Sequence, residues 1–234
     1  MPADRYVSPA GPSRHEVGVK RSRFIACILP VEDEGQARVR LSDLRHEFHD
    51  ARHCCNAYLL GAGRDSAHSS DDGEPAGTAG APIMQALSNH VTATGQADLS
   101  NVLAVVVRYF GGVKLGAGGL TRAYGGAVTQ ALRLTPMLLH EQRALLDVHL
   151  PPADAGRLEA VLRGTLEVLD TVWDDPAGPT VHVACPADTT TTIGTIAALT
   201  SGVGRVDSAG TRWVSHALSP AEPSNGGDMP SRLL

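Results

Sequence analysis

The amino-acid sequence predicts an α+β protein with two domains. The first observation is residues 102–107, a continuous apolar run rich in valine that is typical of a buried central strand. The second is the glycine-rich stretch 111–119, after which an amphipathic helix continues to about Leu134. The third is the order strand, helix, strand, strand, helix, strand over about 70 residues from Ala144 onward, which is the ferredoxin-like arrangement.

The first domain begins with a predicted strand at 24–30 and a helix from about Asp33. Asp33 is a suitable N-cap, and Gln36 stands where a capping box places an amide. Apolar residues then recur at helical spacing and give this helix one inner face: Ala37, Leu41, Leu44 and Phe48. A second strand is predicted at 53–60. Residues 68–81, rich in Gly, Ser and Asp, are predicted to form a loop.

Two further helices complete this domain. The first is predicted at 81–90, with Pro82 in its first turn. The second follows the central strand and has one apolar stripe: Leu120, Ala123, Tyr124, Ala127, Val128 and Ala131. Gly125 and Gly126 each destabilise a helix interior by roughly 0.5–1 kcal/mol. We therefore expect another backbone to pack closely against these two glycines.

The second domain is predicted to contain four strands and two helices. The strands are expected at 144–150, 167–173, 180–185 and 205–214, and the helices near 153–163 and 190–200. Proline, glycine and aspartate residues at 174–179 predict a turn between the two middle strands. We place the domains at 15–138 and 142–216, with a disordered N-terminus at 1–14 and a disordered tail at 217–234.

Composition and charge restrict the function classes. The chain has 42% apolar and 19% charged residues, which is enough to form a core. Its net charge of −5 gives no global signature of a nucleic-acid-binding protein, so such binding requires a local basic patch. The first eleven residues are polar, and no stretch approaches the roughly 18 apolar residues of a membrane span. We expect a cytoplasmic monomer without a membrane partner.

The four cysteines indicate a reducing environment. Cys27, Cys54, Cys55 and Cys185 are irregularly spaced, and the adjacent pair cannot easily form a disulfide. No CxxC pair indicates zinc. We expect reduced, mostly buried thiols, with no metal and no cofactor.

Two long motifs resemble the signature of the IMPACT/YigZ family. One is Asp71-Asp-Gly-Glu-Pro-Ala-Gly-Thr-Ala-Gly-Ala-Pro-Ile83, and the other is Val106-Val-Arg-Tyr-Phe-Gly-Gly-Val-Lys-Leu-Gly-Ala-Gly-Gly-Leu-Thr-Arg-Ala-Tyr124. The stretches at 20–25 and 53–58 resemble weaker motifs of the same family, so the resemblance covers about residues 15–135. It implies an N-terminal domain like the second domain of a small-subunit ribosomal protein, and a C-terminal domain like a domain of elongation factor G. For bacterial members it implies contact with nucleic acid or the ribosome without fixing a reaction. We therefore expect a non-enzymatic regulator of translation that contacts RNA, the ribosome or a translation factor.

The glycine-rich turn is the first candidate site. Residues 101–136 contain four basic residues and no acidic one. A glycine-rich turn that leads into a helix can bind an anion, because its backbone N–H groups and the helix dipole favour negative charge. The candidate anion-binding or nucleic-acid-binding residues are Arg108, Lys114, Arg122 and Arg133, together with Gly111, Gly112, Gly118 and Gly119. The spacing matches neither a P-loop nor a dinucleotide motif, so nucleotide hydrolysis is not expected. The alternative is that the glycines only permit a tight turn and close packing.

The acidic loop is the second candidate. Asp71, Asp72 and Glu74 could bind a divalent cation, but their spacing matches no calcium loop. A simpler interpretation pairs Asp72 and Glu74 with Lys114 and Arg122 across a groove. Charge pairing would then set the geometry of the loop.

A small hydrolase is the alternative function. Its groove would combine Asp72, Glu74, His53 and Tyr109 with the basic turn. Neighbouring residues of a strand point to opposite faces, so His53 does not pair simply with Cys54 as a nucleophile, and we assign no catalytic residue. A binding protein needs only exposed charge at this place, whereas an enzyme needs a pocket with converging polar groups and shifted pKa values.

Overall fold

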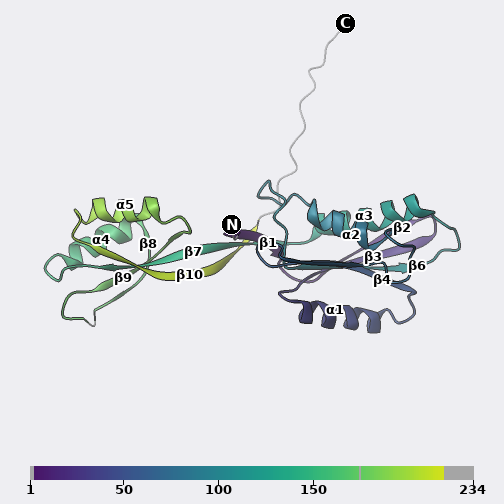
Figure 1. Ribbon diagram of the computed structural model, residues 1–234, viewed down its shortest axis with the longest axis horizontal. Coiled ribbons are helices and arrows are strands. Elements are labelled where there is room, and N and C mark those ends of the chain that lie inside the picture. The colour runs from purple at the N-terminus through teal and green to yellow at the C-terminus, as the bar shows by residue number, and fades with distance from the viewer. Residues whose placement is uncertain (1–2, 174, 219–234) are drawn as a thin grey trace, which may run out of the picture. The chain divides into compact units, whose positions relative to one another are not determined.

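The computed structural model describes residues 3–173 and 175–218, which form two compact units (Figure 1). One unit contains Val7–Leu139 together with residues 217–218, and the other combines the residues up to Tyr6 with His140–His216. Among the described residues, no helix is long and apolar enough to cross a membrane.

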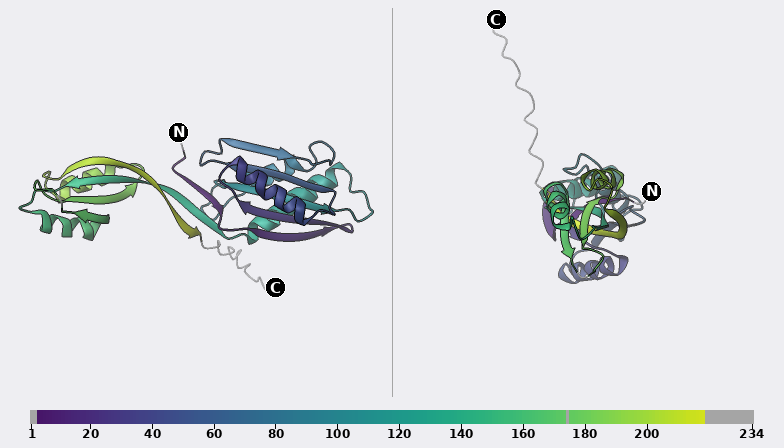
Figure 2. Two further views of the ribbon diagram at one scale, coloured as in Figure 1. Left: turned by 90° about the horizontal axis from the view of Figure 1, so that it is seen from below. Right: turned by 90° about the vertical axis from the view of Figure 1, so that its left-hand side faces the viewer.

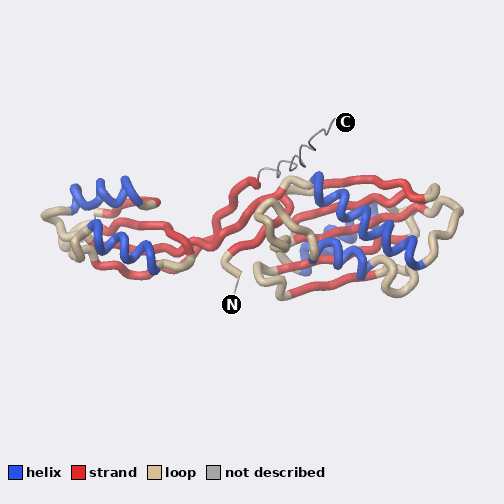
Figure 3. The backbone as a smooth tube through the Cα atoms, turned by 90° about the horizontal axis from the view of Figure 1, so that it is seen from above, coloured by secondary structure: helices blue, strands red, loops and turns tan. Residues whose placement is uncertain are grey.

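The Val7–Leu139 unit is a five-stranded antiparallel sheet with helices on both faces. The strand order is β2-β3-β6-β4-β5. The strands are β2 (Ser13–Val19), β3 (Ser22–Pro30), β4 (His53–Leu60), β5 (Ser66–Ser70) and β6 (Val102–Tyr109). Helix α1 (Glu34–Glu47) lies across one face, as Figure 2 shows. Helices α2 (Gly80–Ser88) and α3 (Ala117–Leu134) lie across the other face (Figure 3).

Two apolar cores lie on the two faces of this sheet. Alternate residues of β3 and β6 pack under α2 and α3, among them Phe24, Ala26, Ile28, Ala104 and Val106. The intervening residues pack under α1, among them Ile25, Cys27, Leu29, Val105 and Val107. Because both faces of β6 are covered, its side chains are buried from Val102 to Arg108, which explains the continuous apolar run in the sequence.

Helix α1 begins where its sequence predicts. The Asp33 carboxylate accepts a hydrogen bond from the Gln36 backbone N–H at 2.8 Å, which confirms the predicted N-cap. The Gln36 side chain accepts from the backbone N–H of Glu32 at 3.2 Å, one residue before the cap. Ala37 and Leu44 are buried beneath the helix.

Helices α2 and α3 approach each other closely at Gly125. A Cβ atom at Gly125 would lie 3.5 Å from the backbone oxygen of Pro82, so the predicted close packing against another backbone is confirmed there. At Gly126 a Cβ would meet nothing within 4 Å. The second glycine therefore borders open space, and its absent side chain leaves room between the two helices.

The second unit has the predicted ferredoxin-like order. Its elements are β7 (Met137–His149), α4 (Ala155–Thr165), β8 (Glu167–Val172), β9 (Thr180–Pro186), α5 (Thr190–Leu199) and β10 (Arg205–Leu218). Strand β7 pairs with β10 and with β9, and β9 pairs with β8. Both helices lie on one face of the sheet (Figure 1), and buried residues between them form a separate core that includes Leu146, Val148, Leu158, Leu162 and Ile196. The α+β class and the ferredoxin-like order of this unit therefore agree with the prediction.

The prediction of a disordered N-terminus at 1–14 is wrong for the described residues. Arg5–Pro9 form strand β1, which pairs with β7, and residues 13–14 already belong to β2. Val7 is fully buried, its N–H donates to the Asp98 oxygen at 2.9 Å, and its own oxygen accepts from Ser100 N at 2.8 Å. The order therefore comes from partners distant in the sequence, which local composition does not reveal.

Two smaller corrections concern the loop and the tail. The predicted loop at 68–81 begins within a strand, because Ser66–Ser70 form β5 and pair with β4. In the predicted tail at 217–234, Ala217 and Leu218 belong to β10, and the remaining residues lie outside the described part of the chain.

Candidate anion-binding groove

The carboxylate of Glu74 lies inside the Val7–Leu139 unit and accepts two charged or polar donors. Arg108 Nη1 donates to it at 2.6 Å, and the Tyr124 hydroxyl donates to it at 2.8 Å. His53 Nε2 lies 4.0 Å from the same oxygen. The side chains of Glu74 and Arg108 are only 4% and 7% exposed. The prediction that Arg108 binds an external anion is therefore wrong, because an internal carboxylate already occupies its guanidinium.

Burial disfavours ionisation of two side chains next to this carboxylate, Cys55 and Tyr124. It raises the pKa of the Cys55 thiol to about 12, so the thiol keeps its proton at neutral pH. It also raises the pKa of Tyr124 far above the ordinary value, and the neighbouring Cys55 raises it further. Arg108 Nε is buried without a hydrogen-bond partner among the described residues. Cys55 and Tyr124 are fully buried.

The rest of the acidic loop also has internal partners. Asp72 pairs with Arg45 of α1 at 2.5 Å and accepts from the Cys54 N–H at 2.7 Å. Burial alone would raise the pKa of Asp71, but backbone N–H groups of Gly77, Gly80 and Ala79 together lower it. These three donors lie 2.8–2.9 Å from the Asp71 carboxylate, in the turn that leads into α2 and at its first residue.

The predicted pairing of the acidic loop with Lys114 and Arg122 is therefore wrong. Arg108, rather than either of these residues, pairs with Glu74, with its Nη1 2.6 Å from the carboxylate. Within the described residues, no group of three or more His, Cys, Asp or Glu side chains is placed to hold a metal ion.

The four groove candidates do not line one groove. His53 lies beside the acidic loop, and its Nδ1 is 2.8 Å from the backbone oxygen of Asp72. The Tyr109 hydroxyl donates to Asp50 at 2.6 Å, and its ring packs with the core beneath α1. Tyr109 and Arg108 are neighbours in β6 and point to opposite faces of the sheet. Tyr109 is therefore separated from Glu74 by the sheet.

The glycine-rich turn contains glycines of two kinds. A Cβ atom at Gly111 would lie 2.0 Å from the backbone of Arg21, so this position must be glycine for the turn between β2 and β3 to fit. Gly112 and Gly116 have φ of +83° and +72°, the region that glycine adopts without strain. These three glycines permit a tight turn and close packing, as the alternative to anion binding predicted.

Three predicted cations remain exposed: Lys114, Arg122 and Arg133. Among the described residues, none of the three forms an ion pair with a carboxylate. A Cβ atom at Gly118 would lie 3.6 Å from Arg122 Nη1, which places this guanidinium over the first turn of α3. A Cβ atom at Gly119 would lie 3.0 Å from the Cβ atom of Leu115. The predicted basic turn is thus reduced to Lys114 and Arg122 at the start of α3 and Arg133 near its end.

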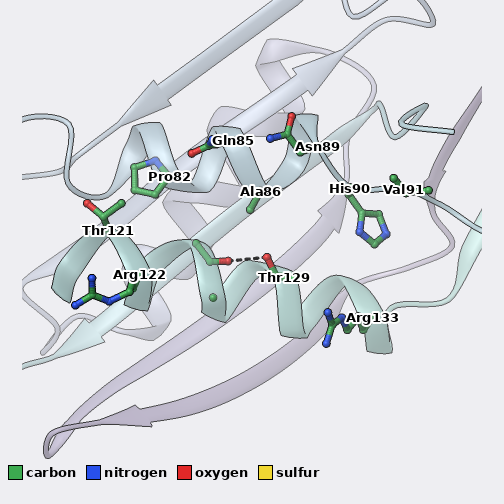
Figure 4. Close-up of a pocket in the computed structure, with 12 residues that line it drawn as sticks. Pro82, Gln85, Ala86, Asn89, His90, Val91, Thr121, Arg122, Thr129 and Arg133 are labelled. Carbon is green, nitrogen blue, oxygen red and sulfur yellow. Dashed lines mark hydrogen bonds between the residues drawn. The ribbon is translucent and has the colours of Figure 1, made fainter. Parts of the chain in front are cut away.

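A groove of about 580 Å³ lies between α2 and α3 (Figure 4). The polar and basic side chains that line it are Gln85, Asn89, His90, Thr121, Arg122, Thr129 and Arg133. The lining contains no Asp or Glu. Figure 4 shows Arg122 and Arg133 at separate points along α3, with Thr129 between them donating to the Gly125 oxygen at 2.9 Å. Eleven residues of helix separate the two arginines by about 16 Å along its axis.

The α2 side of this groove was not found from the sequence. His90 is mostly buried there. Burial is the main cause that lowers its pKa, and the charge of Arg133 lowers it further, whereas Asp98 raises it. Gln85 and Asn89 add amide donors and acceptors on the same side. The glycine pair at 125–126 was the available signal, because Gly126 leaves the space that the groove occupies.

Comparison with known proteins gives consistent matches. The family model described as the Impact N-terminal domain matches residues 20–132. IMPACT family member YvyE of Bacillus subtilis (strain 168) is 37% identical over 152 residues, which cover 64% of this chain and 65% of that protein. IMPACT family member YigZ of Escherichia coli (strain K12) is 42% identical over 132 residues, or 56% of this chain and 61% of that protein. These two matches span less than two thirds of either relative.

Two further matches extend over more of the relative's length. An IMPACT family member of Haemophilus influenzae is 40% identical over 158 residues, which cover 67% of this chain and 72% of that protein. A crystal structure of a hypothetical protein is similar over 87% of this chain and 96% of its own, with a TM-score of 0.55 and 32% identity. The match to this crystal structure supports the fold of both units.

Proposed function

The chain belongs to the IMPACT family, and from this premise we propose that it is a non-enzymatic regulator of translation that contacts RNA through the groove between α2 and α3. The observation that carries the proposal is the lining of that groove. Arg122 and Arg133 line it without a carboxylate partner among the described residues, and no acidic side chain lines it with them. On a chain of net charge −5, such a groove concentrates positive potential at one place.

The groove suits a nucleic-acid backbone better than a small anion. Two arginines about 16 Å apart along α3 can each neutralise a different phosphate. Thr121 and the amides of Gln85 and Asn89 lie in the same lining and can bond sugar or base edges. Lys114 is exposed in the turn before α3 and extends the basic surface. In this proposal the partner is ribosomal or other RNA of the translation machinery, and the protein acts as a cytoplasmic monomer.

The hydrolase alternative has less support. Asp72 is held by Arg45 and the Cys54 N–H, Glu74 is held by Arg108, and the Glu74 side chain is 4% exposed. Burial raises the pKa of the nearby Cys55 thiol to about 12, which removes the strongest nucleophile. The groove between α2 and α3 is open to solvent and is lined by basic and amide side chains, which suits binding.

The proposal is tested by titrating a fluorescent single-stranded RNA with the protein at several salt concentrations. Affinity should fall as salt rises, with a log–log slope of roughly −0.7 for each phosphate contact. The double variant Arg122→Gln, Arg133→Gln should bind more weakly, and the size of its slope should fall by about 1.4, the value for two lost contacts.

The matched control is Arg40→Gln, Arg52→Gln, which removes two exposed arginines outside the groove. It should keep the affinity and the slope of the parent. Equal binding by the parent and both variants would place the RNA surface elsewhere. A parent protein without RNA affinity at low salt would refute the proposal.

A further inference from the structure

A second groove, of about 330 Å³, lies on the opposite face of the sheet between α1 and strands β4 and β5. Its floor includes the carboxamide of Asn56 and the side chain of Leu103. One side is formed by the rings of Tyr58 and His68, whose centroids lie 5.5 Å apart. The volume is at the lower end of the range for small-molecule sites in proteins.

Asn56 presents polar atoms to this groove although the residue is only 3% exposed. Its Nδ2 donates to the Cys54 backbone oxygen at 3.2 Å, which uses one of its two N–H groups. Its Oδ1 accepts no hydrogen bond from the described residues. Oδ1 is also absent from the buried unpartnered atoms of the described chain, which are Arg108 Nε and Arg143 Nε. The carbonyl oxygen must therefore be reachable from the groove.

A half-satisfied carboxamide is an unfavourable choice for the floor of a core. On the same face, Leu103, Val105 and Cys54 are apolar and buried, whereas Ser70 of β5, paired with Asn56, is polar and accepts from Asp72 N. An apolar residue at 56 would avoid the cost of burying an unpaired carbonyl. Among the described residues, the bond to Cys54 is the one hydrogen bond of this carboxamide. The amide is explained if a ligand supplies the missing partners.

We propose that this groove binds the base of an adenine nucleoside or nucleotide. An asparagine carboxamide pairs with adenine through two bonds, since Oδ1 accepts from the N6 amino group and Nδ2 donates to N7. On that edge guanine has two acceptors, O6 and N7, so its O6 would face Oδ1 without a proton between them. The flat ring of the base would lie against Tyr58, the more buried ring of the aromatic pair.

Charge at the rim decides whether a phosphate is also bound. Arg38 is exposed, and its Nη1 lies 3.9 Å from a Glu34 carboxylate oxygen, which makes a weak ion pair. Arg45 Nη2 is held by the Asp72 carboxylate at 2.5 Å. Arg38 is therefore the cation that a phosphate group would engage. The nucleoside and the nucleotide share the base contacts and differ only in this one.

The proposal is tested by adding adenosine, AMP, inosine and guanosine separately to the full-length protein, at concentrations up to about 1 mM, and measuring binding by calorimetry and by the shift in melting temperature. Adenosine should bind saturably. Inosine replaces the amino group by a carbonyl and should bind at least about tenfold more weakly, as should guanosine, because Oδ1 would be left unpaired. If AMP binds more tightly than adenosine, and this difference disappears in Arg38→Gln, then Arg38 also contacts the phosphate.

The variant Asn56→Leu should abolish adenosine binding while the protein still melts cooperatively. Gln130→Leu, which removes an exposed carboxamide that lines neither groove, should leave adenosine binding unchanged. If Asn56→Leu does not fold, the comparison of adenosine with inosine on the parent protein still decides the question. No saturable adenosine binding, equal binding of inosine, or full binding by Asn56→Leu would each overturn the proposal.

Discussion

At the residue scale, the role of a charged residue depends more on its partner than on its position in a motif. Arg108 and Arg122 stand in the same acid-free stretch of sequence, yet the Arg108 side chain is only 7% exposed beside Glu74, while Arg122 is exposed at the groove. A buried ion pair is costly to break, because removal of one member leaves the other charged and desolvated. Arg108 is therefore a determinant of stability, and Arg122 of binding.

The change Arg108→Met should destabilise the fold by about 3–5 kcal/mol, because Glu74 would lose its cationic partner while staying buried. Urea unfolding followed by circular dichroism measures this loss. Arg23→Met, which removes an exposed pair with Glu16, is the control and should leave the unfolding midpoint nearly unchanged. A loss for Arg108→Met no larger than that of the control would mean that the pair does not hold the loop.

His90 should make stability depend on pH in the acidic range. In the fold, burial and the charge of Arg133 lower its pKa below the ordinary value of 6.5. As pH falls below 6.5, the unfolded chain takes up the proton before the folded chain does, so folding stability is lost until pH passes through the lowered pKa. His90→Gln should show a smaller loss than the parent between neutral pH and mildly acidic pH, measured by urea unfolding at each pH. Identical pH dependence of the two proteins would contradict the assignment.

At the element scale, glycines set the distance between α2 and α3 and the shape of the groove. Gly125 allows the backbone of Pro82 to approach, whereas Gly126 faces open space. In the turn before α3, Gly111 lies against the backbone of Arg21 with no room for a side chain. Glycines within one motif thus serve contact, groove formation and turn geometry separately.

The change Gly126→Ala should stabilise the protein by about 0.5–1 kcal/mol, because alanine lowers the entropy cost of the helix and meets no neighbour. The added methyl group narrows the groove, so RNA affinity should fall in the same variant. Thermal unfolding and the RNA titration measure the two effects. Gly111→Ala should instead destabilise, because its Cβ would lie 2.0 Å from backbone. A destabilised Gly126→Ala protein would show that the space beside this position is not open.

At the scale of the whole molecule, the chain forms two units with separate cores. The core of the second unit consists of residues between Ala144 and Val206 only, and the two cores of the first unit end at Met137. Strands β1, β7 and β10 each contain residues of both units, so the chain passes between the units within strands.

Residues 140–216 expressed alone should unfold cooperatively, because all described residues of their core lie within this range. A thermal melt followed by circular dichroism and by the fluorescence of Trp173 and Trp213 should give coincident transitions. A molten, aggregating fragment would mean that the second unit needs the first in order to fold.

The sequence alone determined most of the elements, though not β1, β2 or β5, and it indicated the family. Helical spacing predicted α1, α3, α4 and α5, the apolar run predicted β6, and Asp33 predicted a helix start, because each of these signals depends on neighbours within a few residues. Two motifs, each continuous in the chain, were sufficient to indicate the IMPACT family. The order of the last six elements was sufficient to predict the ferredoxin-like unit.

Only the tertiary structure decided which charges meet and where grooves open. Glu74 finds Arg108 34 residues away and Tyr124 50 residues away, and β1 becomes ordered by pairing with β7. Each groove is formed by elements that are separated in the chain, α2 with α3 and α1 with β4 and β5. Ion pairing and burial depend on which elements are adjacent in space, and that adjacency follows from the packing of the whole sheet, which local sequence patterns do not specify.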